Sequence, residues 1–140
     1  MHNVNDDVYW TGYVDWDLRM FHGYSTPEGS TYNAYLIMDE QPTLIDTVKH
    51  YGFDEMLMRI RQVIDPAKIR YIVSNHTEMD HSGSIAMLLR HCPDAQVVCS
   101  PKGHEGLLRH FKSEWPFRVV QNGERLSIGK RELTFVHMPM

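Results

Sequence analysis

Short runs of β-branched and aromatic residues, separated by turn-forming residues, recur along the whole chain and predict β-strands. Two of the early runs are joined by the turn at 39–42 and predict an antiparallel hairpin, whereas the segment 17–30 has no regular pattern. We expect strands at 8–15, 32–38, 43–47, 69–74, 96–100, 117–120, 124–128 and 131–137.

Apolar residues three and four positions apart predict an amphipathic helix after the third strand. This helix should stop before Pro66, because the residue ahead of a proline disfavours helical geometry. A short helix at 84–90 and a longer one that opens at Pro101 and runs through Phe111 are expected further along. The apolar positions of the first helix are Phe53, Met56, Leu57, Ile60, Val63 and Ile64.

The stretch with the clearest chemistry follows the strand at 69–74. His76, Glu78, Asp80 and His81 lie within six positions. This spacing does not fit one face of a helix, where neighbours recur at three and four, so we predict a tight loop. Two-residue spacing in such a loop can aim imidazole and carboxylates into one cavity, and the consecutive Asp80 and His81 would suit two metal ions better than one. The alternative is a solvated polar turn.

Composition excludes several classes of protein. The 140 residues are 42% hydrophobic and 23% charged, as in ordinary globular domains. A net charge of -4 without a basic stripe argues against nucleic-acid binding. No apolar run approaches the about 20 residues that span a bilayer, and the polar N-terminus does not resemble a signal peptide. The two cysteines lack a C-x-x-C spacing, which favours reduced thiols in a cytoplasmic protein.

The sequence His76-Thr77-Glu78-Met79-Asp80-His81 closely resembles the metal loop of the metallo-β-lactamase superfamily. The superfamily usually has histidine in the third position, and glutamate there is the mark of the flavodiiron proteins, also called A-type flavoproteins. Other stretches resemble the same family in the same order, at 14–17, 21–24, 31–36, 44–48 and 126–131.

This resemblance implies a metallo-β-lactamase-like αββα sandwich of the α/β (α+β) class. Residues 1–140 would supply only the N-terminal portion of its di-iron domain. The chain ends on an apolar strand without a polar tail. We therefore expect the rest of that domain, and a flavodoxin-like domain that binds FMN, to be absent from it.

The resemblance also assigns roles to individual residues. His76 and Glu78 would bind the iron nearer the flavin, and Asp80 and His81 would bind the other iron. A carboxylate-rich ligand set without thiolate suits non-haem iron, although spacing does not exclude zinc or manganese.

Three further residues would lie beside the metal ligands. His22 and Tyr24 would donate a hydrogen bond or a proton to bound oxygen; the alternative for His22 is a partly buried histidine beside a turn glycine. Asp46 would orient a ligand histidine, or is an ordinary turn or helix-capping residue.

The function implied is that of an oxidoreductase that reduces dioxygen to water, nitric oxide to nitrous oxide, or both. Electrons would pass through FMN from rubredoxin or a similar donor, within a head-to-tail homodimer or a tetramer. The alternative is a zinc-dependent hydrolase of the same superfamily that acts on a thioester or lactone, and Glu78 counts against it. By itself, the 140-residue chain is expected to bind metal weakly and to be inactive.

Overall fold

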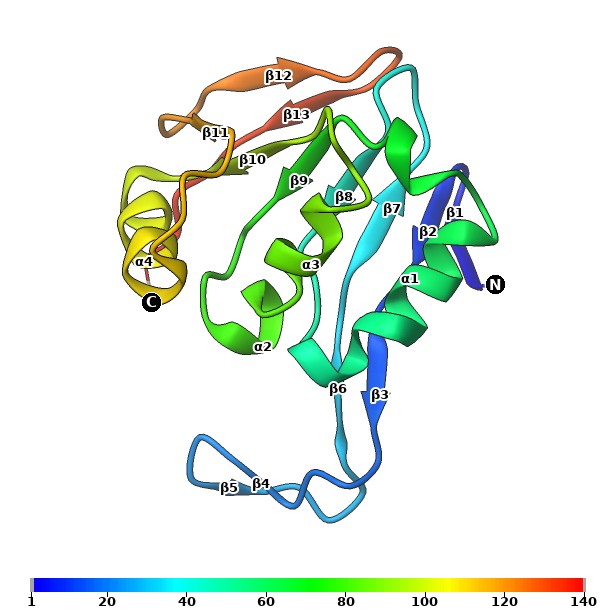
Figure 1. Cartoon of the computed structure of the whole chain (residues 1–140), viewed down its shortest axis with the longest axis vertical. Coiled ribbons are helices and arrows are strands. Elements are labelled where there is room, and N and C mark those ends of the chain that lie inside the picture. Colours follow the sequence, from blue (N-terminus) through cyan, green and yellow to red (C-terminus); the bar gives the residue numbers. More distant parts are fainter. Residues whose placement is uncertain (1, 140) are drawn as a thin grey trace.

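A mixed seven-stranded sheet forms the centre of the computed structural model, which describes residues 2–139 (Figure 1). From β1 to β8 the neighbouring strands are antiparallel, and from β8 to β11 they are parallel. In spatial order the strands are β1 (His2–Asn5), β2 (Val8–Trp10), β7 (Tyr35–Ile37), β8 (Thr43–Ile45), β9 (Tyr71–Val73), β10 (Gln96–Cys99) and β11 (Phe117–Val119).

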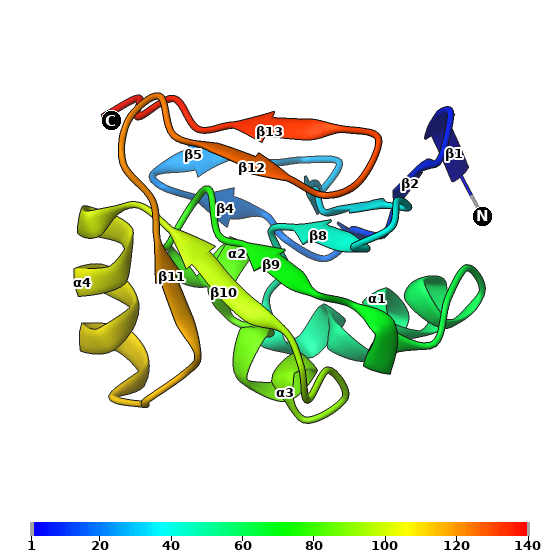
Figure 2. The same ribbon diagram turned by 90° about the horizontal axis from the view of Figure 1, so that it is seen from above.

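Helices cover one face of this sheet (Figure 2). They are α1 (Phe53–Arg61), α3 (Ile85–Leu89) and α4 (Pro101–Phe111). The buried side of α1 carries the residues that the periodicity selects up to Ile60 and packs against Leu36 and Ile72 of the sheet. The helix ends at Arg61, before the predicted limit at Pro66, and Pro66 opens the short 3-10 helix η2 (Pro66–Lys68).

A second, smaller sheet covers the opposite face (Figure 2). It consists of β12 (Arg125–Ser127) and β13 (Glu132–Thr134), which pair antiparallel. Leu126 and Ile128 from this hairpin form a buried cluster with Val73 and Val98 of the central sheet. The layer order is therefore helix, sheet, sheet, as the αββα expectation requires.

Two predicted strands are each broken in the middle. The run at 8–15 divides into β2 and β3 (Tyr13–Asp15), and the run at 32–38 divides into β6 (Ser30–Tyr32) and β7. At the breaks the backbones approach so closely that a side chain at Gly12 would overlap the Tyr32 carbonyl. Strands β3 and β6 pair with each other and carry the chain away from the central sheet (Figure 1).

The segment 17–30, predicted to be irregular, contains a small hairpin. Its strands are β4 (Met20–Phe21) and β5 (Tyr24–Ser25), and it turns at His22 and Gly23, whose φ angles are 48° and 80°. The prediction also missed the exposed edge strand β1, because three of its four residues are polar.

One carboxylate joins the β12–β13 hairpin to the turn between β7 and β8. The Asp39 side chain, 1% exposed, accepts the backbone N–H groups of Lys130 at 2.9 Å and Arg131 at 3.0 Å. The Arg131 guanidinium also lies 3.4 Å from Asp39 and donates to the Asp6 carbonyl at 2.7 Å. The Lys130 N–H group, followed by those of Glu40 and Arg131, lowers the pKa of Asp39.

Replacing Asp39 by Asn should loosen this attachment, because the amide keeps the shape but loses the charge and one acceptor oxygen. We expect Asp39→Asn to lower the Tm at pH 7 by a few degrees, and the exposed neighbour variant Glu40→Gln to leave it unchanged. A carboxyl with a lowered folded-state pKa stabilises the fold above its ordinary pKa of 3.8 and loses that effect as pH falls through the lowered value. The difference in Tm between the variant and the wild type should therefore shrink in acid; a constant difference would contradict this role.

Candidate metal centre

The candidate site lies where two adjacent parallel strands end. Strand β8 is followed directly by Asp46, and β9 leads into the loop that contains His76. Loops that leave the carboxyl ends of neighbouring parallel strands meet at the same edge of a sheet. The Asp46 N–H donates to the Val73 carbonyl at 2.7 Å, so pairing continues to this edge.

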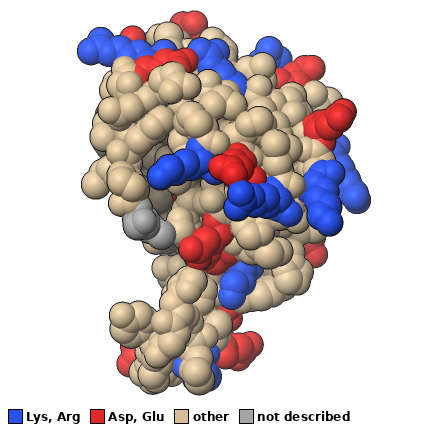
Figure 3. Space-filling view, turned by 90° about the vertical axis from the view of Figure 1, so that its left-hand side faces the viewer, with Lys and Arg blue, Asp and Glu red and all other residues tan. Residues whose placement is uncertain are grey.

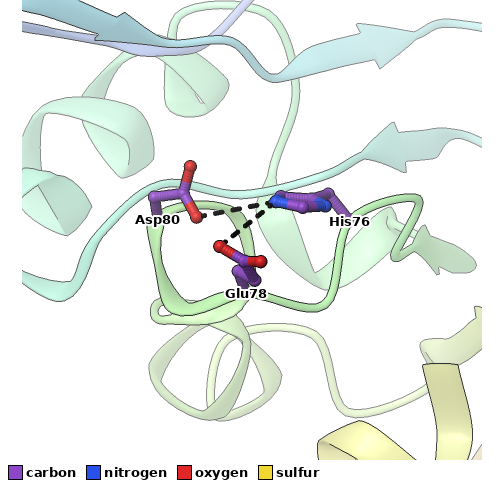
Figure 4. A group of neighbouring side chains, drawn as sticks. All are labelled: His76, Glu78 and Asp80. Atoms are coloured by element: carbon purple, nitrogen blue, oxygen red, sulfur yellow. Dashed lines mark ion pairs between the residues drawn. The ribbon is translucent and has the colours of Figure 1, made fainter. Parts of the chain in front are cut away.

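Three of the predicted ligands converge in this loop. His76, Glu78 and Asp80 each offer a ligand atom, and these atoms all lie within 4.8 Å of one another (Figure 4). The His76 Nε2 atom is 3.7 Å from Glu78 Oε2 and 3.9 Å from Asp80 Oδ1. Glu78 is half exposed and Asp80 is buried. Because carboxylates held together repel each other unless a cation lies between them, the geometry favours a bound cation.

The prediction of a non-helical loop is wrong for its second half. Asp80 and His81 belong to the single helical turn α2 (Met79–Ser82). On a helix, consecutive side chains diverge by about 100°, and His81 accordingly lies outside the group of three. Its Nε2 atom is 3.4 Å from Asp80 Oδ2, on the other side of that carboxylate.

His81 also carries an unsatisfied nitrogen. Its Nδ1 atom is buried and has no hydrogen-bond partner among the described residues. The nitrogen that faces Asp80 is Nε2, so a cation shared with that carboxylate would bind Nε2, and the unsatisfied Nδ1 is not itself evidence for that cation. The donor set of imidazole and carboxylate without thiolate fits iron, and it also accommodates zinc or manganese.

Asp46 holds the loop through its backbone. One oxygen of its carboxylate accepts the N–H groups of Asn75 at 2.8 Å and His76 at 3.2 Å. Burial raises the pKa of Asp46, against the opposing influence of the His76 N–H and of the nearby His81. The backbone at Asp46 has a φ of 55°. Asp46 therefore fixes the main chain of a candidate ligand, and its orientation of a ligand imidazole stays a prediction.

Other supporting residues had no clear signal in the sequence. The N–H and hydroxyl groups of Thr47 both donate to the His81 carbonyl, at 2.9 and 2.7 Å. The Ser82 hydroxyl donates to the Thr77 carbonyl at 2.8 Å. Gly103 of α4 faces Thr77, where a Cβ atom would lie 3.1 Å from the Thr77 methyl. In the sequence, Thr47 could have been selected only because it follows Asp46, and Ser82 only because it follows the metal loop.

The β4–β5 hairpin brings His22 to the site but not Tyr24. The His22 Nε2 atom lies 3.3 Å from Glu78 Oε2. Tyr24 is 76% exposed and does not line the cavity. This cavity has a volume of about 560 Å³ and is lined by Phe21, His22, Asn75, His76, Glu78, Asp80, His81 and Met138.

On the face shown in Figure 3, acidic and basic side chains are interspersed. The lobe that projects below has a tan centre with acidic and basic side chains along its edges. Among residues 2–139, no helix is both long and apolar enough to cross a membrane.

Comparison with known proteins gives consistent matches. Residues 31–140 match the family model described as ODP family beta lactamase. The chain is 42% identical to a nitric oxide reductase from Moorella thermoacetica, over 98% of this chain and 35% of that protein. It spans about a third of the length of the curated relatives it matches.

Solved structures of flavodiiron-type proteins are also similar to this chain. The rubredoxin oxygen:oxidoreductase of Desulfovibrio gigas has a TM-score of 0.92 and 44% identity, over 96% of this chain and 34% of that one. The flavodiiron protein of Giardia intestinalis has a TM-score of 0.89 and 42% identity, over 94% and 32%. A B3 metallo-beta-lactamase with an active-site glutamic acid is less similar, with a TM-score of 0.69 and 28% identity over 91% and 48%.

The family match covers most of the chain, and the metal loop, the layered fold and the flavodiiron structures lead to the same assignment. The chain therefore belongs to the ODP family of beta-lactamase-like proteins and corresponds to the N-terminal metallo-β-lactamase-like domain of the flavodiiron proteins.

Proposed function

We propose that this chain is the metal-binding part of a flavodiiron reductase that reduces dioxygen to water, nitric oxide to nitrous oxide, or both. The observation that carries the proposal is the convergence of His76, Glu78 and Asp80 within 4.8 Å, with His22 beside them. The similar proteins named nitric oxide reductase and rubredoxin oxygen:oxidoreductase support both substrates.

A pair of iron ions would be held by His76, Glu78, Asp80 and His81. The position of His81 beyond the group of three supports a second ion, because Asp80 has one oxygen near His76 and the other near His81. When bound, the iron pair would supply the electrons that reduce the substrate.

The remaining residues would prepare the site. Asp46 and Thr47 fix the loop before the metal binds, so the ligands need little rearrangement. Phe21 and Met138 contribute apolar surface to the lining of the cavity. His22 lies where its Nε2–H could donate a hydrogen bond or a proton to a substrate beside Glu78.

We extend the proposal to the electron supply. FMN would be carried by a flavodoxin-like domain outside these 140 residues, and reduced by rubredoxin or a similar donor. A head-to-tail homodimer or a tetramer would bring the flavin to the site. The names flavodiiron protein and rubredoxin oxygen:oxidoreductase support a flavin and a rubredoxin donor, and the oligomer is part of the proposal. A cytoplasmic location agrees with the free thiols of Cys92 and Cys99, which are both buried.

A zinc-dependent hydrolase that acts on a thioester or lactone is the second candidate. The matching B3 metallo-beta-lactamase has an active-site glutamic acid, so glutamate alone does not distinguish the two chemistries. The identity of the bound metal, iron or zinc, does distinguish the reductase from the hydrolase.

Metal content tests the ligand assignment. We expect the full-length protein, purified without oxygen, to contain iron, and Glu78→Gln or Asp80→Asn to lose most of it, because a neutral amide is a much weaker ligand than a carboxylate. The exposed variant Glu114→Gln should retain the wild-type content, and elemental analysis measures all four proteins. Zinc without iron in the wild-type protein would favour the hydrolase.

Turnover tests the role of His22. In the full-length protein with reduced rubredoxin as donor, we expect His22→Asn to lower kcat by about 10²-fold, the usual loss for a general acid, without loss of iron. The exposed variant His110→Gln is the matched control. Tyr24→Phe tests the other predicted donor; a loss as large as that of His22→Asn would mean that the hairpin brings Tyr24 to the substrate during turnover. An unchanged kcat in His22→Asn would contradict the proton-donor role.

A further inference from the structure

Three aromatic rings surround the ammonium group of Lys49 at the base of the β4–β5 hairpin. The Lys49 Nζ atom lies 5.2 Å from the ring centroids of Phe21 and Tyr32 and 5.8 Å from that of Tyr51. All three distances are within the range of cation–π attraction. Among residues 2–139, Lys49 forms no ion pair, because no carboxylate oxygen lies within 4.0 Å of its ammonium group. The three rings are therefore its nearest electrostatic partners. We call Phe21, Tyr32 and Tyr51 the Lys49 cage.

A buried carboxylate fixes two walls of the cage. The Tyr32 hydroxyl donates to Asp15 Oδ2 at 2.9 Å, and the Tyr51 hydroxyl donates to the same oxygen. Asp15 is 5% exposed and Tyr32 is 1% exposed. Burial, followed by hydrogen bonds with Tyr51 and Asp15, raises the pKa of Tyr32, so its side chain stays a neutral phenol. A phenol that donates to a carboxylate has an electron-rich ring, which strengthens its attraction for a cation.

The main chain of Lys49 is attached to the metal loop. Its carbonyl accepts a hydrogen bond from the Ser84 hydroxyl at 3.2 Å. Thr47, two residues before Lys49, donates a hydrogen bond to the His81 carbonyl. A Cβ atom at Gly83 would lie 3.4 Å from the Lys49 Cα, so the loop packs directly against this residue. Lys49 therefore connects the helical turn with Asp80 and His81 to Phe21, the neighbour of His22.

The hairpin depends on such a connection. Each of its strands has only two residues, and a hairpin of this size is not stable alone. The His22–Glu78 pair joins side chains that are 55% and 48% exposed, so it contributes little. A cation bound by Glu78 would weaken it further. The contact of Phe21 with Lys49 does not involve a metal ligand and would persist.

We propose that Lys49 is a positioning residue that holds the β4–β5 hairpin, and with it His22, over the metal loop. The effect on catalysis rests on the proposed function, because it requires His22 to act on a substrate. The restraint of the hairpin does not depend on that function.

Hydrogen exchange of the full-length protein tests the restraint. Lys49→Met keeps the length of the side chain but removes the charge, and Lys49→Arg keeps the charge. We expect the amides of residues 19–26 to exchange about two- to thirty-fold faster in Lys49→Met, as for the loss of a partly buried cation–π contact, and close to the wild-type rate in Lys49→Arg. Strands β9 and β10 should be unaffected, and Lys68→Met, at an exposed lysine, is the control. Unchanged exchange of 19–26, or an equal increase throughout the chain, would overturn the proposal.

A double-mutant cycle tests the connection to His22. We expect Lys49→Met to lower kcat with little change in KM, Lys49→Arg to restore most of it, and Lys49→Met to have no further effect in a protein that already carries His22→Asn. Additive losses would show that Lys49 does not act through His22 and would refute the proposed link. Absence of reductase activity from iron-loaded wild-type protein would refute the proposed function instead, while hydrogen exchange would still decide whether Lys49 restrains the hairpin.

Discussion

The Asp46 carboxylate accepts two backbone N–H groups, and the candidate site depends on this interaction. It joins the end of β8 to the start of the metal loop after β9 and sets the direction in which His76 leaves the sheet. Thr47 then fixes the helical turn that carries Asp80 and His81. The acidic side chains are therefore brought together by hydrogen bonds of the main chain, which can hold them against their mutual repulsion before a cation arrives.

The two sides of the site differ in how firmly they are built. The metal loop follows β9, a central strand whose Ile72 and Val73 are buried on the helix side and on the side of the β12–β13 hairpin. His22 comes from a two-stranded extension that leaves this core along β3 and β6 (Figure 1). The geometry of the candidate ligands is thus set by the sheet and its loops, whereas the position of His22 is set by a few side-chain contacts at the periphery.

Much of the architecture could be predicted because the relevant signals are local. The 3–4 spacing of Met56, Leu57 and Ile60 defines α1, and Ser100-Pro101 defines the start of α4, where the Ser100 hydroxyl caps the helix. The predicted ligands could be found because they lie within six positions, and Glu78 indicated the family. What the sequence does not reveal depends on contacts between distant segments. The break at Gly12 depends on the Tyr32 carbonyl, the turn α2 is held by Thr47, and Lys49 has no distinguishing pattern around it.

The positive φ angles at Asp46 and His22 have a consequence for interpreting variants at these positions. Residues with a β-carbon rarely adopt this conformation, and asparagine, aspartate, histidine and glycine tolerate it best. An alanine at either position would remove the functional group and strain the backbone at once, so its effect could not be assigned to chemistry alone. Asparagine changes the chemistry while keeping a residue that accepts the turn. Variation that preserves folding at these positions should therefore be confined to a small set of residues, whether or not the site retains its metal.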